Sequence, residues 1–589
     1  MAATISTEVY QFRSKLIAHL RKSCGEHHFL DNITNVRIHR QQSVADFIIP
    51  AKCVRSFLSD NSVISSSITA IPNLSQDWPI RVAEATLDSK SGILLKLDRS
   101  CTFQKTLTRH LSLGTKVFYQ GSGKPVPPVL ILSGCRCKAE SNNVNLEKRN
   151  QLRCELVAHH LKSVCKLFGA EVKLVNIPGK DLSPTVCRLT GRGEVLYQSD
   201  DNHKTSAESR QSIMENFRRS LKKHLEIQKT KKMDRSEQNI PSKSATQSCQ
   251  KGSFISENTS ASIDLRHVLD SQKLLVGKRG YSSNLAEVEV LTSTGSPCNT
   301  LQQCVELEEA AADIAEDSIP VVVHISVPSQ SFLQQKVDLL WRTLSEKSER
   351  FQQVHTTIGP VSLSDTHGGG SDVGDVESIV ALYDAELREA SAVKYGDDIQ
   401  ELETEQQRRA VLVKAAITFD ILSTALGSTV KLDLSPKTES SESRRGVFVL
   451  YNYARLATLF DRFNGEVTKG VYPPLPPLNE VHFDVLREEE EWKLLFCYVM
   501  QFPDILRETL GDLYSSTLPF FNPNPHKVSS FLYNLSRDLS VYYSRTHILV
   551  EPREHLLPTM YARLYLLKSV MLVMKEGLDL LDIEPLLQM

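Results

Sequence analysis

Two periodicities of apolar residues run along this chain, a helical one near both ends and a strand-like one in short runs. Residues 6–22 have apolar side chains at helical spacing, whereas the runs that begin at Ala45 and Gly92 are typical of strands. Over the last third of the chain the helical spacing continues almost throughout and is interrupted by proline-rich stretches. We therefore expect an N-terminal α+β domain at 1–110 and a helical bundle at 401–589.

The middle of the chain alternates strands and helices. The run that begins at Val129 predicts a buried strand, residues 152–168 predict a helix that stops at Gly169, and the run from Val172 predicts a second strand. Strand, helix and strand of these lengths indicate a βαβ unit with a parallel sheet. A further strand begins at Val321 and is followed by a helix. The expected α/β core has two halves, at 111–200 and 311–400.

Residues 201–310 separate these halves and have a different composition, rich in Ser, Thr, Gln, Asn and Lys with few aromatics. Such a stretch buries too little apolar surface to offset the entropy of ordering it, so we expect much of it to be disordered. Its first part is basic. The run is a solvated charged helix, an arm that contacts phosphate, or a nuclear import signal. The candidates for phosphate contact are Arg218, Arg219, Lys222 and Lys223.

Overall charge and composition exclude some classes of protein. With 69 Lys plus Arg against 70 Asp plus Glu in 589 residues, the chain is not a globally basic binder of nucleic acid. No apolar run is long enough to span a membrane, and the N-terminus lacks a secretory apolar region, so we predict a cytoplasmic protein with, at most, a nuclear pool. The 12 cysteines are scattered, and the pair Cys135 and Cys137 matches no usual zinc spacing. We therefore expect reduced thiols and no metal.

Familiar catalytic motifs are absent from the sequence. There is no G-x-x-x-x-G-K-[ST], H-E-x-x-H or G-x-S-x-G pattern. The stretch from Gly121 to Lys124 is too short to cradle a triphosphate and is interpreted as a turn, and the glycines after His367 as a surface loop. We assign no catalytic residue and no cofactor.

One helical segment near the C-terminus has two distinct stripes. At 100° per residue, Val449, Leu456, Phe460 and Phe463 share a face that predicts a core contact. A second face combines aromatic rings with guanidinium groups, which suits single-stranded RNA because unstacked bases lie on such surfaces. The alternative is that its aromatic residues pack against another helix. The members of this second stripe are Phe448, Tyr451, Arg455 and Arg462.

The same segment resembles a known family. Phe448-Val-Leu-Tyr-Asn-Tyr-Ala-Arg455 is similar to the Tyr-x-x-Tyr-Ala-x-Ala-Arg pattern in the DALR anticodon-binding domain of arginyl-tRNA synthetases. Further matches follow in order, from Glu491-Trp through His526-Lys-Val-Ser-Ser to the terminal run that ends at Met589. The resemblance implies that Phe448, Tyr451 and Arg455 contact anticodon-loop bases. Second candidates lie on a neighbouring helix, with Tyr533 and Tyr542 equally compatible with core positions: Tyr533, Arg537, Tyr542 and Tyr543.

The resemblance extends upstream more faintly. It implies an N-terminal domain that contacts the tRNA elbow and a Rossmann-like class I synthetase core. Registering on Gly169 sets the family's His-x-Gly-His nucleotide signature against Lys148-Arg-Asn-Gln151, in which both histidines and the glycine are missing. The histidines hold ATP phosphates and the glycine lets the adenine approach the backbone. The resemblance therefore implies a degenerate, non-aminoacylating relative of these synthetases.

The function implied by the resemblance is that of an adaptor. Such a protein binds arginine tRNA by its anticodon arm and presents it to a tRNA methyltransferase that forms 3-methylcytidine in the anticodon loop, without contacting DNA or membranes. The sequence also allows two alternatives. One is a protein-interaction scaffold with no RNA role, and the other is a divergent but active arginyl-tRNA synthetase.

Overall fold

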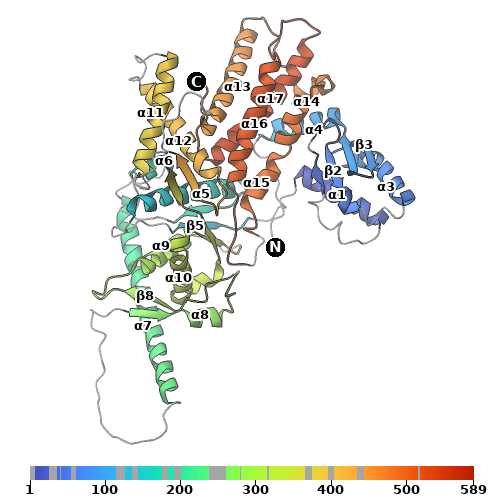
Figure 1. Cartoon of the computed structure of the whole chain (residues 1–589). Helices are drawn as coiled ribbons and strands as arrows, with labels where there is room; N and C mark the ends of the chain where they lie inside the picture. The colour runs from blue at the N-terminus through green and yellow to red at the C-terminus, as the bar shows by residue number, and fades with distance from the viewer. Residues whose placement is uncertain are drawn as a thin grey trace, which may run out of the picture.

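The computed structural model describes most of the chain (Figure 1). The described residues are 7–24, 36–39, 41–54, 61–114, 126–134, 143–175, 184–190, 201–237, 261–278, 280–314, 318–364, 374–395, 403–433, 444–514 and 518–589. No helix among them is long and apolar enough to cross a membrane.

The N-terminal domain is an antiparallel sheet covered by helices. Its elements in chain order are α1 (Glu8–Cys24), β1 (Arg37–Ile38), β2 (Phe47–Pro50), α2 (Ala51–Val54), α3 (Asn61–Leu74), β3 (Val82–Asp88), β4 (Gly92–Leu97) and α4 (Arg99–Leu113), with the strands in the order β1-β2-β4-β3. Gly92 begins β4 with φ +116°, and a Cβ there would lie 2.0 Å from the Ile49 carbonyl oxygen. Only glycine allows this close approach of two strands.

A four-stranded parallel sheet forms the centre of the molecule. Its elements are β5 (Val129–Ser133), α5 (Val144–Leu167), β6 (Val172–Leu174), β9 (Val321–Ser326), α10 (Pro328–Leu344) and β10 (Gln352–Thr357). The strand order is β10-β9-β5-β6 and every pairing is parallel. Both central strands, β5 and β9, are buried along their whole length, which explains why they are predominantly apolar, although β9 also contains His324. The predicted βαβ unit is confirmed.

Residues 201–310 contain a folded layer, so the prediction of disorder is wrong for the described part. The layer comprises α7 (Asp201–Glu237), β7 (Ala261–Asp264), α8 (Arg266–Ser271), β8 (Glu287–Leu291) and α9 (Asn299–Ala311). Val268, Val290 and Leu301 form a second apolar core together with Trp341 of α10. The apolar partner of this layer lies on a helix far along the chain, and local composition does not reveal such a partner. Residues 238–260 lie outside the described part.

The C-terminal region is a helical bundle. It contains α11 (Val376–Tyr395), α12 (Glu403–Leu422), α13 (Arg445–Thr468), α14 (Glu489–Lys493), a π-helical turn (Leu494–Val499), α15 (Phe502–Leu510), α16 (His526–Arg545) and α17 (Leu557–Leu580). One strand, β12 (Val430–Asp433), interrupts the expected helical pattern and pairs in parallel with β11 (Val361–Ser364) of the core. The short helix α6 (Pro184–Thr190) packs against α5, and 3₁₀ turns lie at Ser75–Asp77, Glu346–Arg350, Leu478–Glu480 and Phe483–Val485.

The N-terminal domain is fastened directly to the bundle, beside α14 (Figure 1). The Trp492 indole nitrogen donates to Asp46 Oδ1 at 2.7 Å, while Asp46 Oδ2 accepts from the Leu97 amide at 2.8 Å. Phe47 meets Phe496 edge to face, with 5.3 Å between ring centroids. Burial raises the pKa of Asp46. The two regions therefore share one apolar core.

Candidate nucleic-acid interface on α13 and α16

The two stripes of α13 separate as the sequence predicted. Val449 and Leu456 are fully buried and Phe463 is 3% exposed, so this face packs into the bundle, with Phe460 at its edge. Tyr451 on the other face is 42% exposed. The helix thus has one face in the core and one face toward α16 and solvent.

The second stripe of α13 meets aromatic residues of α16 in one cluster. The Arg455 guanidinium carbon lies 4.3 Å from the Tyr543 ring centroid and 5.5 Å from that of Tyr451. The rings of Phe448 and Tyr533 are 6.0 Å apart, and Arg445 lies over Tyr533 at 5.4 Å. These cation–π contacts hold planar groups at the surface. We call this set the α13–α16 cluster; its members are Arg445, Phe448, Tyr451, Arg455, Tyr533 and Tyr543.

Most members of this cluster were predicted from the sequence, and one was not. Arg445 was missed, although it precedes Phe448 by one turn and so lies on the same face. Arg462 and Arg537 are exposed, and no described ring contact includes either of them. Arg537 has a long ion-pair distance of 3.8 Å to its neighbour Asp538.

Tyr542 is a core residue rather than a surface candidate. Its side chain is 1% exposed, and its hydroxyl donates to Glu491 Oε1 at 3.2 Å. Burial raises the pKa of Tyr542. Of the two tyrosines that the sequence left open, Tyr533 therefore belongs to the cluster and Tyr542 to the interior.

An ion-pair network fixes the start of α13. Arg444, the residue before the helix, stacks on Tyr383 of α11 with 3.6 Å between the guanidinium carbon and the ring centroid. It donates to Glu386 at 2.7 Å and to Asp420 at 2.9 Å. Burial alone would lower the pKa of Arg444, but Tyr383 and these carboxylates more than offset it and raise that pKa. The network joins α11, α12 and α13.

Residues 148–151, which the sequence sets against the synthetase nucleotide signature, lie within α5, and two of their side chains hydrogen-bond to backbone groups of this chain. Arg149 is fully buried and donates from Nε to the Val361 carbonyl at 3.2 Å and from Nη1 to the Gly374 carbonyl. Asn150 Oδ1 accepts from the Val361 amide at 2.9 Å. These side chains bind the chain's own backbone around β11. The loop glycines after His367 lie outside the described residues.

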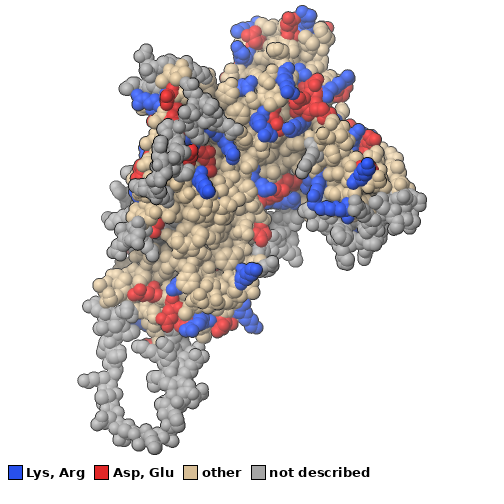
Figure 2. Space-filling model, in the orientation of Figure 1, with Lys and Arg blue, Asp and Glu red and all other residues tan. Residues whose placement is uncertain are grey.

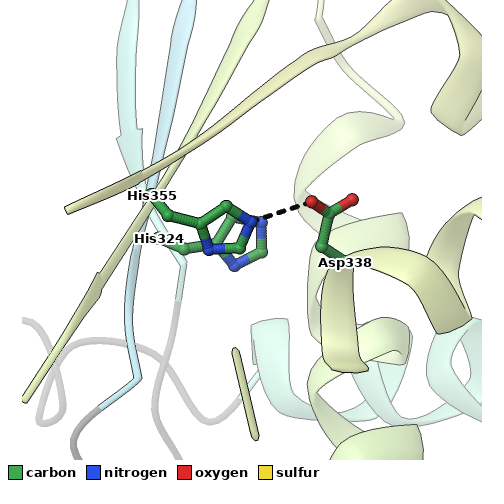
Figure 3. A group of neighbouring side chains, drawn as sticks. All are labelled: His324, Asp338 and His355. Atoms are coloured by element: carbon green, nitrogen blue, oxygen red, sulfur yellow. Dashed lines mark hydrogen bonds and ion pairs between the residues drawn. The ribbon is translucent and has the colours of Figure 1, made fainter. Parts of the chain in front are cut away.

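A second polar group in the core, which was not predicted from the sequence, brings together His324, Asp338 and His355 (Figure 3). All three are buried, and their ligand atoms lie within 4.8 Å of one another. Asp338 accepts from His355 Nε2 at 2.8 Å, from the Tyr281 hydroxyl at 2.6 Å and from Arg342 Nε at 2.7 Å. The only signal in the sequence is that both histidines stand in strands.

These residues do not fit a metal ion. The two imidazole rings are stacked, with centroids 4.6 Å apart and an angle of 17° between their planes. An ion bound by imidazole lies near the ring plane along the nitrogen lone pair, and two nearly parallel, stacked planes offer no such common position. Burial alone would raise the pKa of Asp338, but Arg342 and His355 hold it well below its usual range. The group is a buried ion-pair network.

On the face of the molecule drawn in Figure 2, charges are mixed rather than segregated. Figure 2 shows basic and acidic side chains interspersed over the helical bundle, and few charges over the middle of this face. The four predicted basic residues of α7, Arg218, Arg219, Lys222 and Lys223, are all exposed and lie on a different part of the molecule from the α13–α16 cluster.

Comparison with known proteins agrees with this architecture. Residues 449–589 match the family model described as DALR anticodon binding domain. A curated protein of Rattus norvegicus named DALR anticodon-binding domain-containing protein 3 is 29% identical over 568 residues, covering 93% of this chain and 94% of that protein. Among solved structures, the arginyl-tRNA synthetase of Plasmodium falciparum has a TM-score of 0.55 at 12% identity, covering 98% of this chain and 99% of that chain. The enzyme of Thermus thermophilus has a TM-score of 0.52 at 14% identity, with coverage of 98% and 99%.

The fold class expected from the sequence is therefore confirmed. The chain has the arginyl-tRNA synthetase fold, with an N-terminal α+β domain, a Rossmann-like α/β core and a C-terminal helical bundle.

Proposed function

We propose that this protein binds transfer RNA and recognises its anticodon arm through the α13–α16 cluster. The observation that carries the proposal is a set of half-exposed aromatic rings held in place by guanidinium groups on one face of the bundle. Bases of an anticodon loop can stack on such rings, each stack contributing on the order of 1–3 kcal/mol. The match of residues 449–589 to an anticodon-binding domain supports the same proposal.

The proposed function also includes the identity of the bound tRNA and the reaction carried out on it. We infer arginine tRNA because the chain resembles arginyl-tRNA synthetases in its fold and in its C-terminal motifs. In this proposal the protein presents arginine tRNA to a methyltransferase that forms 3-methylcytidine in the anticodon loop. The support for that partner is the family resemblance stated from the sequence, together with the likeness of nearly the whole chain to a protein named for its DALR anticodon-binding domain.

The proposed role does not include aminoacylation. Lys148-Arg-Asn-Gln151 offers neither the paired histidines nor the glycine that hold ATP in the synthetases. Arg149 and Asn150 already bond to the backbone of β11, so they are not free to hold phosphate. We propose that the α/β core is a scaffold between the N-terminal domain, which would contact the tRNA elbow, and the C-terminal bundle, which would bind the anticodon arm.

The decisive experiment is sequencing of RNA crosslinked to the full-length protein and to the double variant Tyr451→Ala with Arg455→Ala. We expect the wild type to enrich arginine tRNA over bulk RNA and the double variant to lose that enrichment tenfold or more, because two planar contacts are removed. Arg553→Ala is the matched control, since Arg553 is exposed in a loop and pairs only locally with Glu551. Thermal melting checks that all three proteins are folded.

Each alternative has its own outcome. A folded double variant that still selects arginine tRNA would show that these side chains only pack the bundle. No enrichment of any tRNA by the wild type would favour a protein-interaction scaffold. Arginine-dependent exchange of pyrophosphate into ATP by the purified protein would contradict the non-catalytic role.

A further inference from the structure

The long helix α7 carries a compact row of basic side chains that the anticodon interface does not use. Arg218 and Lys222 are one helical turn apart, as are Arg219 and Lys223, so the four cations form two adjacent pairs on one side of the helix. All four are exposed. We call them the α7 row.

Packing of the opposite face fixes the direction in which the α7 row points. Phe217 and Leu221 are each 3% exposed and belong to the second apolar core, beside α9 and α10. Arg210, two turns earlier, donates to Glu309 of α9 at 2.7 Å. With one face buried and one end held by an ion pair, the helix cannot turn the α7 row inward.

The α7 row has no carboxylate partner within the described part of the chain. Other exposed cations of this region do have one, such as Arg266 with Asp264 at 3.0 Å and Lys347 with Glu308 at 3.5 Å. Glu215 and Glu226 stand one helical turn before and after the α7 row, and no carboxylate stands between its four members. Four positive charges over two turns, none of them in an ion pair with a described carboxylate, attract a polyanion.

The chemistry of the α7 row favours RNA over a protein partner. Every exposed side chain between 208 and 226 is polar or charged, since the apolar side chains of this stretch are half or fully buried. Protein interfaces depend on aromatic or aliphatic anchors, which the row lacks. Phosphate groups require only cations, and each contact releases counterions.

The location of the α7 row decides which part of an RNA it reaches. The α7 helix packs on the second apolar core, whereas α13 and α16 belong to the bundle at the opposite end of the molecule (Figure 1). Residues 440–589 contain more acidic than basic residues, so neutralisation of the RNA backbone has to come from elsewhere. We propose that the α7 row binds phosphates of the tRNA in the part remote from the anticodon loop, an inference that rests on the proposed function.

The test compares two RNAs and two variants of the full-length protein. The first variant carries Arg218→Gln, Arg219→Gln, Lys222→Gln and Lys223→Gln, in which glutamine keeps helix propensity. The control variant removes four cations that each have a carboxylate partner, by Arg266→Gln, Lys347→Gln, Arg553→Gln and Lys575→Gln. The RNAs are an arginine tRNA transcript and its isolated anticodon stem-loop. Dissociation constants are measured at several salt concentrations.

We expect the α7 variant to bind the whole tRNA at least tenfold more weakly at low salt. The slope of log affinity against log salt should fall in magnitude by about 3, because four phosphate contacts at about 0.7–0.9 each are lost. Its affinity for the stem-loop should equal that of the wild type, and the control variant should keep the wild-type slope.

Each other result overturns the inference in a recognisable way. An unchanged slope for the whole tRNA means that the α7 row does not touch RNA. An equal loss on the stem-loop means that the row acts through a general field rather than at the remote part of the tRNA. If the wild-type protein binds neither RNA, the proposed function fails together with this inference.

Discussion

Asp338 is a buried carboxylate that depends on three hydrogen-bond donors from other residues. Its carboxylate is fully buried and accepts hydrogen bonds from Tyr281, Arg342 and His355, which come from a loop, a helix and a strand. A buried charge is tolerated only when partners replace its hydration, and loss of one partner leaves the others uncompensated. The residue therefore ties the inserted layer to the parallel sheet.

Asp338→Asn should destabilise the protein strongly. The amide carries no charge and has only one acceptor oxygen, so the Arg342 charge stays buried without its counter-ion, at a cost of about 3–5 kcal/mol. Urea denaturation followed by tryptophan fluorescence measures the loss. The control is Glu346→Gln, an exposed residue, expected within about 0.5 kcal/mol of wild type. Equal stability of the two variants would contradict the importance of the network.

At the scale of elements, α13 decides where the α13–α16 cluster lies. Arg444 holds its first turn to α11 and α12, and Gly446 lets its backbone approach α12 closely. A Cβ on Gly446 would lie 2.4 Å from the Ala415 carbonyl oxygen, whereas a Cβ on Gly465 of the same helix meets nothing within 4 Å. Close packing against α12 therefore requires a glycine at 446, whereas no neighbouring atom requires one at 465.

The two glycines predict opposite effects of the same substitution. Gly446→Ala should lower the free energy of unfolding by about 1–3 kcal/mol, because α13 has to move away from α12. Gly465→Ala should raise it by about 0.5–1 kcal/mol, because alanine loses less backbone entropy in a helix. Urea midpoints measured side by side test the pair. A destabilised Gly465→Ala, or an unaffected Gly446→Ala, would show that this packing is described wrongly.

Over the whole molecule, buried histidines make stability depend on pH. Burial lowers the pKa of His110 in α4, of His160 in α5 and of His324 in β9 to about 4 in each case. In the unfolded chain a histidine binds a proton near pH 6.5. Between these values the unfolded chain binds more protons, so stability is complete above about pH 6.5 and falls as the pH is lowered toward 4.

Acidification from pH 7 to pH 5 should therefore destabilise the protein by about 1–2 kcal/mol for each of these histidines. His160→Asn is the test variant, because asparagine can still donate to the Leu580 carbonyl, which His160 Nδ1 contacts at 2.9 Å. The difference in unfolding free energy between the two pH values should shrink by the share of His160. An undiminished difference would mean that His160 is not a neutral buried base.

Local sequence patterns revealed those features that depend on neighbouring residues. The pattern of apolar residues over 129–174 revealed the βαβ unit. The two stripes of α13 distinguished core from surface because helix geometry alone sets which side chains share a face. Five of the six cluster residues, Phe448, Tyr451, Arg455, Tyr533 and Tyr543, were identified as RNA candidates, although Tyr533 was equally compatible with a core position.

Features that depend on distant partners could not be predicted in this way. The layer formed by α7 to α9 is poor in apolar residues, yet Val268 and Val290 find Trp341 on α10 and become a core. The burial of Tyr542 depends on Glu491, and the network of Asp338 joins residues from three elements. The amino-acid composition of a short segment carries no information about contacts with residues far away in the sequence.

The fastening of the N-terminal domain to the bundle has a practical consequence for dissecting this protein. A fragment that begins near residue 445 would lose Asp46, whose carboxylate accepts the hydrogen bond from the Trp492 indole N–H, and would expose the ring of Phe496 to water. This fragment would expose an apolar surface that the N-terminal domain covers in the intact protein. The fragment would then aggregate, and its aggregation would be mistaken for a lack of RNA binding. Point substitutions in the full-length protein are therefore the better way to measure how much each region contributes to RNA binding.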